Sequence, residues 1–173
     1  AATKRTILML LRPDFFKAKL LSEIDKAERK ALKTGIPALF RLNGTSDIDF
    51  SEIYRARPES QFYDYSKELS RVRKNNLTNY DLTFSGSMYS TQSRAALKKA
   101  VKSGYRIAVA FNTKNIASDT LQVSSSMASF DKTDLRHLDG NVIGSLTRKG
   151  SNKAERAAED KNENSFFITT ANL

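Results

Sequence analysis

The chain has 173 residues, of which 39% are hydrophobic, with no Cys, one His and a formal net charge of +10. This length and hydrophobic fraction are typical of one globular domain with a sizeable core, and they exclude a disordered chain. The lack of Cys excludes disulfides and thiolate metal sites, the lone His137 excludes a His-rich metal centre, and no apolar run approaches the ~20 residues of a membrane helix.

The excess of Lys and Arg favours a polyanionic partner, such as nucleic acid, an acidic protein or an anionic surface. A basic protein whose charges simply face water has the same composition, so both interpretations stay open. No signal-peptide pattern opens the chain, and the default location is the cytoplasm of the cell that makes it.

Two helices are predicted before the first strand. Residues 3–11 form a short apolar helix that Pro13 interrupts, and a longer helix covers about residues 15–33. Apolar side chains recur in the longer helix at steps of three and four, so one stripe is buried and the basic side chains lie mostly off it. This basic face and the charged stretch 68–79 supply the candidate nucleic-acid contacts, with a solvated surface as the alternative. These contacts are Lys26, Arg29, Lys30, Arg71, Arg73 and Lys74.

Strand and helix signals alternate after residue 35. Short apolar or alternating runs predict strands at 38–42, 61–65, 80–84, 106–111, 141–146 and 165–170, with a weaker one at 121–123. Helical pieces are predicted at 51–56 and 92–102, with one or two turns within 132–138. Because strand–helix–strand units give right-handed parallel crossovers, the predicted fold class is α/β, a mainly parallel sheet or incomplete (β/α) barrel with helices outside.

The predicted organisation is a single domain over residues 1–173. It comprises N-terminal helices at 1–35, an α/β body at 36–150, a polar insertion at 151–164 and a final strand at 165–170. The insertion is almost wholly polar, so we expect it to be mobile and partly helical around 154–158.

Polar residues follow the predicted strands. Because the carboxyl ends of parallel strands meet at one edge of a sheet, we expect these residues to line a common crevice, which residues 134–139 could also reach. The ligand-binding candidates are Arg41, Asn43, Thr45, Ser46, Ser85, Asn112 and Arg136.

Four further residues are candidates for catalysis: Asp47, Asp64, Lys67 and His137. Asp47 and Asp64 would hold a hard cation such as Mg²⁺ through carboxylate oxygens, and His137 or an Asp would act as general acid or base. The alternatives are structural, since Asp47 can stabilise a turn, Arg136 can pair with a nearby carboxylate, and a lone His is more often structural. No Gly-rich phosphate loop, nucleophile elbow or zinc signature is present.

Six stretches of the chain, in order, resemble the bacteriophage gene product 88 family. They are Arg41–Asp47, Gln61–Lys67, Asn79–Ser85, Ile107–Phe111, Asp134–Asp139 and Val142–Leu146. The similarity covers about residues 20–150 and implies a phage or prophage origin, in a family whose activity is not established. It also implies a Cys-bearing segment upstream of the first helix. A metal or iron–sulfur cluster bound by such a segment would not be held by residues 1–173, which include no Cys.

Residues and resemblance together predict a phage accessory protein that binds an anionic ligand, nucleic acid or nucleotide, at the carboxyl ends of its strands. One alternative is a metal-assisted enzyme acting on phosphorylated substrates through Asp47, Asp64 and Lys67. Another is a virion or interaction protein without activity. Whether the chain is an enzyme stays open, and the expected location is the host cytoplasm or the virion.

Overall fold

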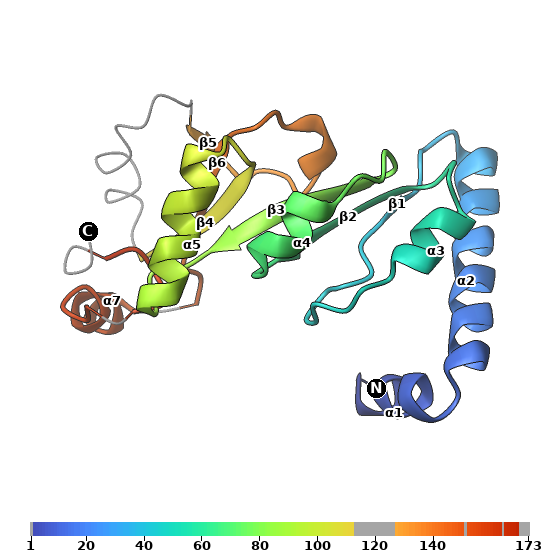
Figure 1. Cartoon of the computed structure of the whole chain (residues 1–173), viewed down its shortest axis with the longest axis horizontal. Helices are drawn as coiled ribbons and strands as arrows, with labels where there is room; N and C mark the ends of the chain where they lie inside the picture. Colours follow the sequence, from blue (N-terminus) through green and yellow to red (C-terminus); the bar gives the residue numbers. More distant parts are fainter. Residues whose placement is uncertain (1, 113–126, 151, 164, 170–173) are drawn as a thin grey trace. The chain divides into compact units, whose positions relative to one another are not determined.

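A computed structural model of the chain describes residues 2–112, 127–150, 152–163 and 165–169 (Figure 1). It contains a six-stranded sheet of order β1-β2-β3-β4-β6-β5, and every pairing described is parallel. The strands are β1 (Leu39–Phe40), β2 (Gln61–Ser66), β3 (Tyr80–Gly86), β4 (Ile107–Phe111), β5 (Met127–Ser129) and β6 (Ile143–Thr147). The helices are α1 (Ala2–Leu11), α2 (Pro13–Thr34), α3 (Ser51–Ala56), α4 (Leu69–Lys74), α5 (Thr91–Lys102), η1 (Arg136–Leu138) and α7 (Lys153–Glu159). The α/β class and the parallel sheet predicted from the sequence are therefore confirmed.

The first four strands lie beside one another in chain order, as predicted, with a helix in each connection. The predicted final strand is present as a single parallel bridge between Phe111 and Ile168. Its neighbour Ser165 explains the short pairing, because the Ser165 hydroxyl accepts a hydrogen bond from the Phe167 backbone N–H at 3.0 Å and turns the chain locally. The predicted strand at 121–123 lies outside the described residues. Across the described part of the chain, no helix is both long enough and apolar enough to cross a membrane.

The chain divides into two compact units, and the first comprises residues 1–63 and 77–81. Its core is aromatic: the Tyr54 ring stacks on Tyr80 at 4.0 Å between centroids and contacts Phe62 at 4.8 Å. The Asn79 side chain donates to the carbonyls of Tyr54 and Arg57 at 2.9 Å each, which ends α3 and starts β3. Pro at the first position and Gly35 in the left-handed conformation (φ 67°) explain where α2 begins and ends.

The second unit comprises residues 64–76 and 82–173. Helix α5 begins where the Ser90 hydroxyl accepts from the Ser93 backbone N–H at 3.1 Å. A Cβ at Gly86 would lie 2.7 Å from the Leu97 side chain of α5, so α5 packs closely on the end of β3. The core of this unit is aliphatic and aromatic. Its buried apolar side chains include Leu69, Val72, Leu82, Phe84, Ala100, Ile107, Ala108, Val109, Phe111, Phe130, Ile143 and Ile168.

The segment predicted as a mobile insertion contains α7, close to the helical stretch expected at 154–158. Asn152 caps this helix by accepting from the Glu155 backbone N–H at 2.9 Å. The segment also has partners in the rest of the second unit, because its Arg156 carbonyl accepts from Asn112 and the Glu163 carbonyl accepts from Arg94. These hydrogen bonds predict a stability cost on removal, which the polar composition alone does not.

Candidate functional site

The turn after β1 is held together by one of the predicted ligand-binding residues, Asn43. Its side chain is 3% exposed, donates to the Ile48 carbonyl at 2.9 Å and accepts from the Ser46 hydroxyl at 2.8 Å and the Ile48 N–H at 2.9 Å. Both acceptor and donor groups of Asn43 are thus used within the turn. Asn43 and Ser46 shape the backbone here, while Arg41, Thr45 and Asp47 are exposed around it.

The two carboxylates predicted to hold a metal have different environments. Asp47 is exposed in the first unit, whereas Asp64 is fully buried on β2 in the second unit. In the described ranges, no group of three or more His, Cys, Asp or Glu side chains could hold a metal ion. A site made from the two carboxylates alone stays a prediction.

The carboxyl end of β4 carries the buried side chain of Asn112. Its amide group donates to the Arg156 carbonyl at 2.7 Å and is 3.4 Å from an Asp160 carboxylate oxygen. Its own oxygen is buried and has no hydrogen-bond partner among the described residues. Asn112 therefore links the carboxyl end of β4 to α7, the helix that contains Arg156.

A cluster of charged groups lies at the opposite, amino end of β4. We define the arginine cluster as Thr83, Arg106, Phe130, Arg136 and Asp139. Arg106 donates to the Thr83 hydroxyl at 2.9 Å and to the carbonyls of Arg136 and Asp139 at 2.5 and 2.6 Å. Burial lowers the pKa of the Arg106 guanidinium, while the Asp139 carboxylate opposes this effect.

The second guanidinium of the cluster belongs to Arg136, which is 1% exposed. It lies over the Phe130 ring at 3.6 Å from the centroid, pairs with Asp139 at 3.2 Å and donates to the Thr133 carbonyl. Phe130 in turn lies against Gly144 of β6, where an added Cβ would overlap ring atoms. Most of these hydrogen bonds end on backbone carbonyls, so the cluster fixes the path of the chain after β5.

The parallel register explains why the candidate residues of the predicted crevice lie at two separate places on the sheet. Phe84 pairs with Ile107, so Thr83 of β3 is level with Arg106 at the start of β4. Tyr65, one residue before the end of β2, donates to Asp134 at 2.7 Å. The strands are therefore staggered, and residues near the end of β2 meet the 134–139 segment at the amino end of β4.

The stagger separates the later candidates from Asn112. Arg136 contacts the residue that precedes β4, whereas Asn112 follows β4, about 20 Å further along at the usual rise of a strand. His137 lies beside Arg136 in η1, with Nδ1 buried and without a hydrogen-bond partner among the described residues. The structure thus brings Asp134, Arg136 and Asp139 together, and it does not bring them to the carboxyl end of β4.

Two further candidates lie on the second unit. Lys67 is exposed just after β2, and its Nζ is 5.1 Å from the centre of the Phe166 ring. Ser85 is half-buried on β3. Neither shares a described contact with Asn112 or Arg136.

The basic candidates on α2 are exposed, but the same helix also carries acidic residues. Lys26, Arg29 and Lys30 face solvent. Elsewhere along α2, Lys19 pairs with Glu23 at 3.3 Å, and Asp25 accepts from Arg57 at 2.7 Å. This hydrogen bond from Arg57 lowers the pKa of Asp25, and the nearby Arg29 lowers it further, so α2 has a mixed electrostatic surface.

Helices α4 and α5 of the second unit contain no acidic residue, since their sequences are LSRVRK and TQSRAALKKAVK. Right-handed crossovers between neighbouring parallel strands place both helices on the same face of the sheet (green and yellow-green in Figure 1). We define the α4–α5 basic face by its exposed side chains, Arg73, Lys74, Lys98, Lys99 and Lys102. Among the described residues, none of these five takes part in an ion pair within 4.0 Å.

The sequence interpretation included the α4 part of this face but missed the α5 part. The signal was available, because residues 91–102 are a predicted helix with basic and no acidic side chains. The longer helix α2 has more basic residues, but it also carries acidic ones, which α5 does not.

Comparison with known proteins identifies a family but no curated or solved relative. No curated protein and no solved structure matches the chain significantly. A family model described as gene product 88 matches residues 1–163, which extends the resemblance seen in six stretches to nearly the whole chain. The chain therefore belongs to the gene product 88 family of phage proteins.

Proposed function

We propose that this phage protein binds nucleic acid through the α4–α5 basic face. The observation that carries the proposal is the absence of carboxylates from both helices, combined with the exposure of Arg73, Lys74, Lys98, Lys99 and Lys102. Exposed cations on helices that contain no acidic residue attract phosphates, and their binding releases condensed counterions. The net charge of +10 would add long-range attraction.

Binding on this face uses helix surfaces and not a crevice at the strand ends. Asn112 and Arg136, which the sequence predicted as crevice residues, are buried and bonded to protein groups. Contacts from helix surfaces to phosphates do not distinguish one base from another, so we expect binding that depends little on the nucleotide sequence.

A matched pair of variants tests the proposal. One changes Lys98, Lys99 and Lys102 to Ala, and the other changes Lys26, Arg29 and Lys30 to Ala. Both remove three positive charges from exposed positions of a helix. Affinity for a labelled oligonucleotide is measured by fluorescence anisotropy over a salt series, for single-stranded and duplex DNA.

We expect the α5 variant to bind more weakly and to flatten the salt dependence. Each lost phosphate contact reduces the logarithmic slope by about 0.9 for duplex or about 0.7 for single strands, so three contacts reduce it by roughly 2 to 3. The α2 variant should keep most of the slope. Equal losses in both variants would show that only total charge matters, and salt-insensitive or absent binding of the unmodified chain would overturn the proposal.

The same titrations also test the alternative function, a metal-assisted enzyme. Adding Mg²⁺ to the bound oligonucleotide and following its integrity reports turnover, and Asp64→Asn serves as the comparison because Asp64 is fully buried on β2. Mg²⁺-dependent cleavage that Asp64→Asn abolishes would favour the enzyme over a binding protein.

A further inference from the structure

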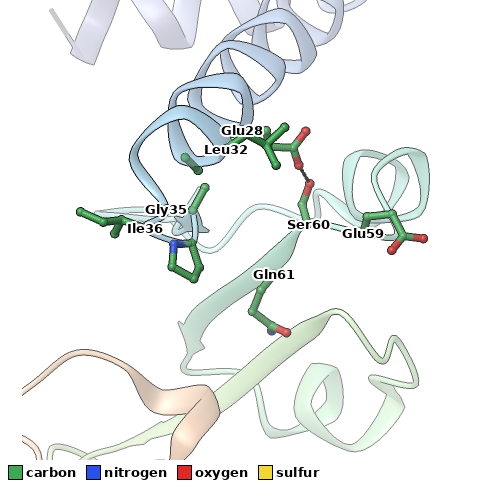
Figure 2. Close-up of a pocket in the computed structure, with 10 residues that line it drawn as sticks. Glu28, Leu32, Gly35, Ile36, Glu59, Ser60 and Gln61 are labelled. Atoms are coloured by element: carbon green, nitrogen blue, oxygen red, sulfur yellow. Dashed lines mark hydrogen bonds between the residues drawn. The ribbon is translucent and has the colours of Figure 1, made fainter.

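An apolar groove lies beside the end of α2 in the first unit (Figure 2). It has a volume of about 610 Å³, and its lining includes Leu32, Ile36 and Pro37 from the end of α2 and the following turn. Leu32 is 84% exposed and Ile36 is 69% exposed. Two large apolar side chains that are exposed to solvent beside one groove indicate a surface that a partner covers.

The rim of this groove is acidic. Glu28 lines it from α2, where it accepts a hydrogen bond from the Ser60 hydroxyl, and Glu59 lines it from the chain before β2 (Figure 2). The groove also adjoins the C-terminal end of α2, where the helix dipole places partial negative charge. Lys30 and Lys33 belong to the same helix but do not line the groove. The groove therefore suits an apolar segment with positive charge.

Helix α1 has this chemistry. Its sequence, ATKRTILMLL, contains Lys4 and Arg5 and no acidic residue. Ile7, Leu10 and Leu11 are 51%, 69% and 72% exposed, and their spacing of three and four residues puts them on one side of the helix. Helix α1 thus presents an uncovered apolar stripe with Lys4 beside it, whereas Arg5 lies on the side of Leu8, where both line another pocket with Glu23.

The α1 helix cannot occupy the groove of its own chain. It packs at the beginning of α2, where the Arg12 N–H donates to the Leu8 carbonyl at 2.8 Å. The groove lies at the other end of α2, about 33 Å away for a helix of 22 residues. An α1 helix that reaches the groove must come from another molecule.

We propose that the chain self-associates by placing α1 of one copy in the α2-end groove of another. Glu28 and Glu59 would face Lys4, while Leu32 and Ile36 would cover the stripe of α1. Because the two surfaces differ, the contact is head-to-tail and builds either a closed ring or a growing chain of copies. Self-association does not depend on nucleic-acid binding, although an assembly would present many basic faces to one polyanion.

Exchanging the charges tests this contact. The first variant carries Glu28→Lys and Glu59→Lys, and the second carries Lys4→Glu and Arg5→Glu. Sedimentation velocity of the full chain at low salt measures the mass as protein concentration rises. We expect the unmodified chain to associate and each variant alone to stay monomeric, because like charges then meet at the contact.

Mixing the two variants in equal amounts should restore association. The basic α1 of the first variant then meets the acidic groove of the second, and the acidic α1 of the second meets the basic groove of the first. Restoration also shows that both variants are folded. A monomeric unmodified chain, variants that associate like it, or a mixture that stays monomeric would overturn the proposal.

Two additional variants complete the design. Leu32→Asp changes a side chain that is 84% exposed, so it should abolish association without changing the circular dichroism or the melting temperature. The matched control reverses the charge of Lys30 and Lys33, which lie on α2 outside the groove, and should leave association intact. Loss of association in this control and unchanged association of Leu32→Asp would each contradict the contact.

Discussion

The two ends of strand β4 use buried polar groups in different ways. At the amino end, Arg106 and Arg136 bring two guanidinium groups under the surface and bond them mainly to backbone carbonyls. At the carboxyl end, the neutral amide of Asn112 makes the link to α7. Charged groups thus hold an irregular segment in place, and one uncharged group holds a short helix.

This difference shows that burial of charge does not by itself mark an active site. Shifted pKa values and buried ions cluster at catalytic centres, but structural networks produce them as well. In the second unit, the buried cations are engaged by the protein itself, whereas the exposed cations of the α4–α5 basic face are accessible to a ligand. We therefore expect the charged end of β4 to contribute more to stability than the neutral end.

The largest loss is expected for Arg136→Met. This change removes the partner of Asp139, the hydrogen bond to Thr133 and the contact with Phe130, and breaking a buried ion pair costs about 3–5 kcal/mol. Urea denaturation measures the free energy of unfolding. Asp139→Asn added to Arg136→Met should recover part of the loss, and a cost below about 1 kcal/mol would mean that the cluster is not an anchor.

A smaller loss is expected for Asn112→Ala. The change removes the donor at 2.7 Å from the Arg156 carbonyl, which keeps its hydrogen bond from the Asp160 N–H at 3.0 Å, so the expected cost is that of one hydrogen bond, about 0.5–1.5 kcal/mol. The same denaturation experiment should rank it below Arg136→Met. The opposite ranking would show that the neutral end of β4 contributes more than the charged end.

A loss between these two is expected when residues 152–163 are replaced by a Gly-Ser linker, because the replacement removes the hydrogen bond of Asn112 and that of Arg94 together. Composition predicts almost no change in the free energy of unfolding. The described hydrogen bonds to the Arg156 and Glu163 carbonyls predict instead a loss of about 0.5–1.5 kcal/mol for each bond. Differential scanning calorimetry measures the change in melting temperature. Asn112→Ala should cost less in the linker variant than in the full chain, since its partner is then absent; an unchanged cost would show that Asn112 acts elsewhere.

Much of the fold could be predicted from local sequence. The apolar run of β4 and the polar residues around it determine a buried strand, and Gly35 ends α2 as expected. The sequence also predicted α3 at its observed bounds, because Pro58 stops that helix soon after Ala56. These features depend on neighbours in the chain, and local patterns report them well.

The candidate site was harder to predict because it depends on strand register. Nothing near Tyr65 indicates that it meets Asp134, and nothing near Thr83 indicates that it meets Arg106. The shift between parallel strands is set by packing between distant segments, so local sequence does not contain it. Polar strand ends that look equivalent in sequence therefore lie at different heights on the sheet.

The close approach of Phe130 to Gly144 links the evolution of strand β6 to that of the turn after β5. Any side chain at 144 would need the space that the ring fills, so this glycine can be replaced only after the ring has become smaller. A smaller residue at 130 would also remove the surface under Arg136. Across the gene product 88 family, the residues equivalent to Phe130, Arg136 and Gly144 should therefore be inherited as a set and exchanged together.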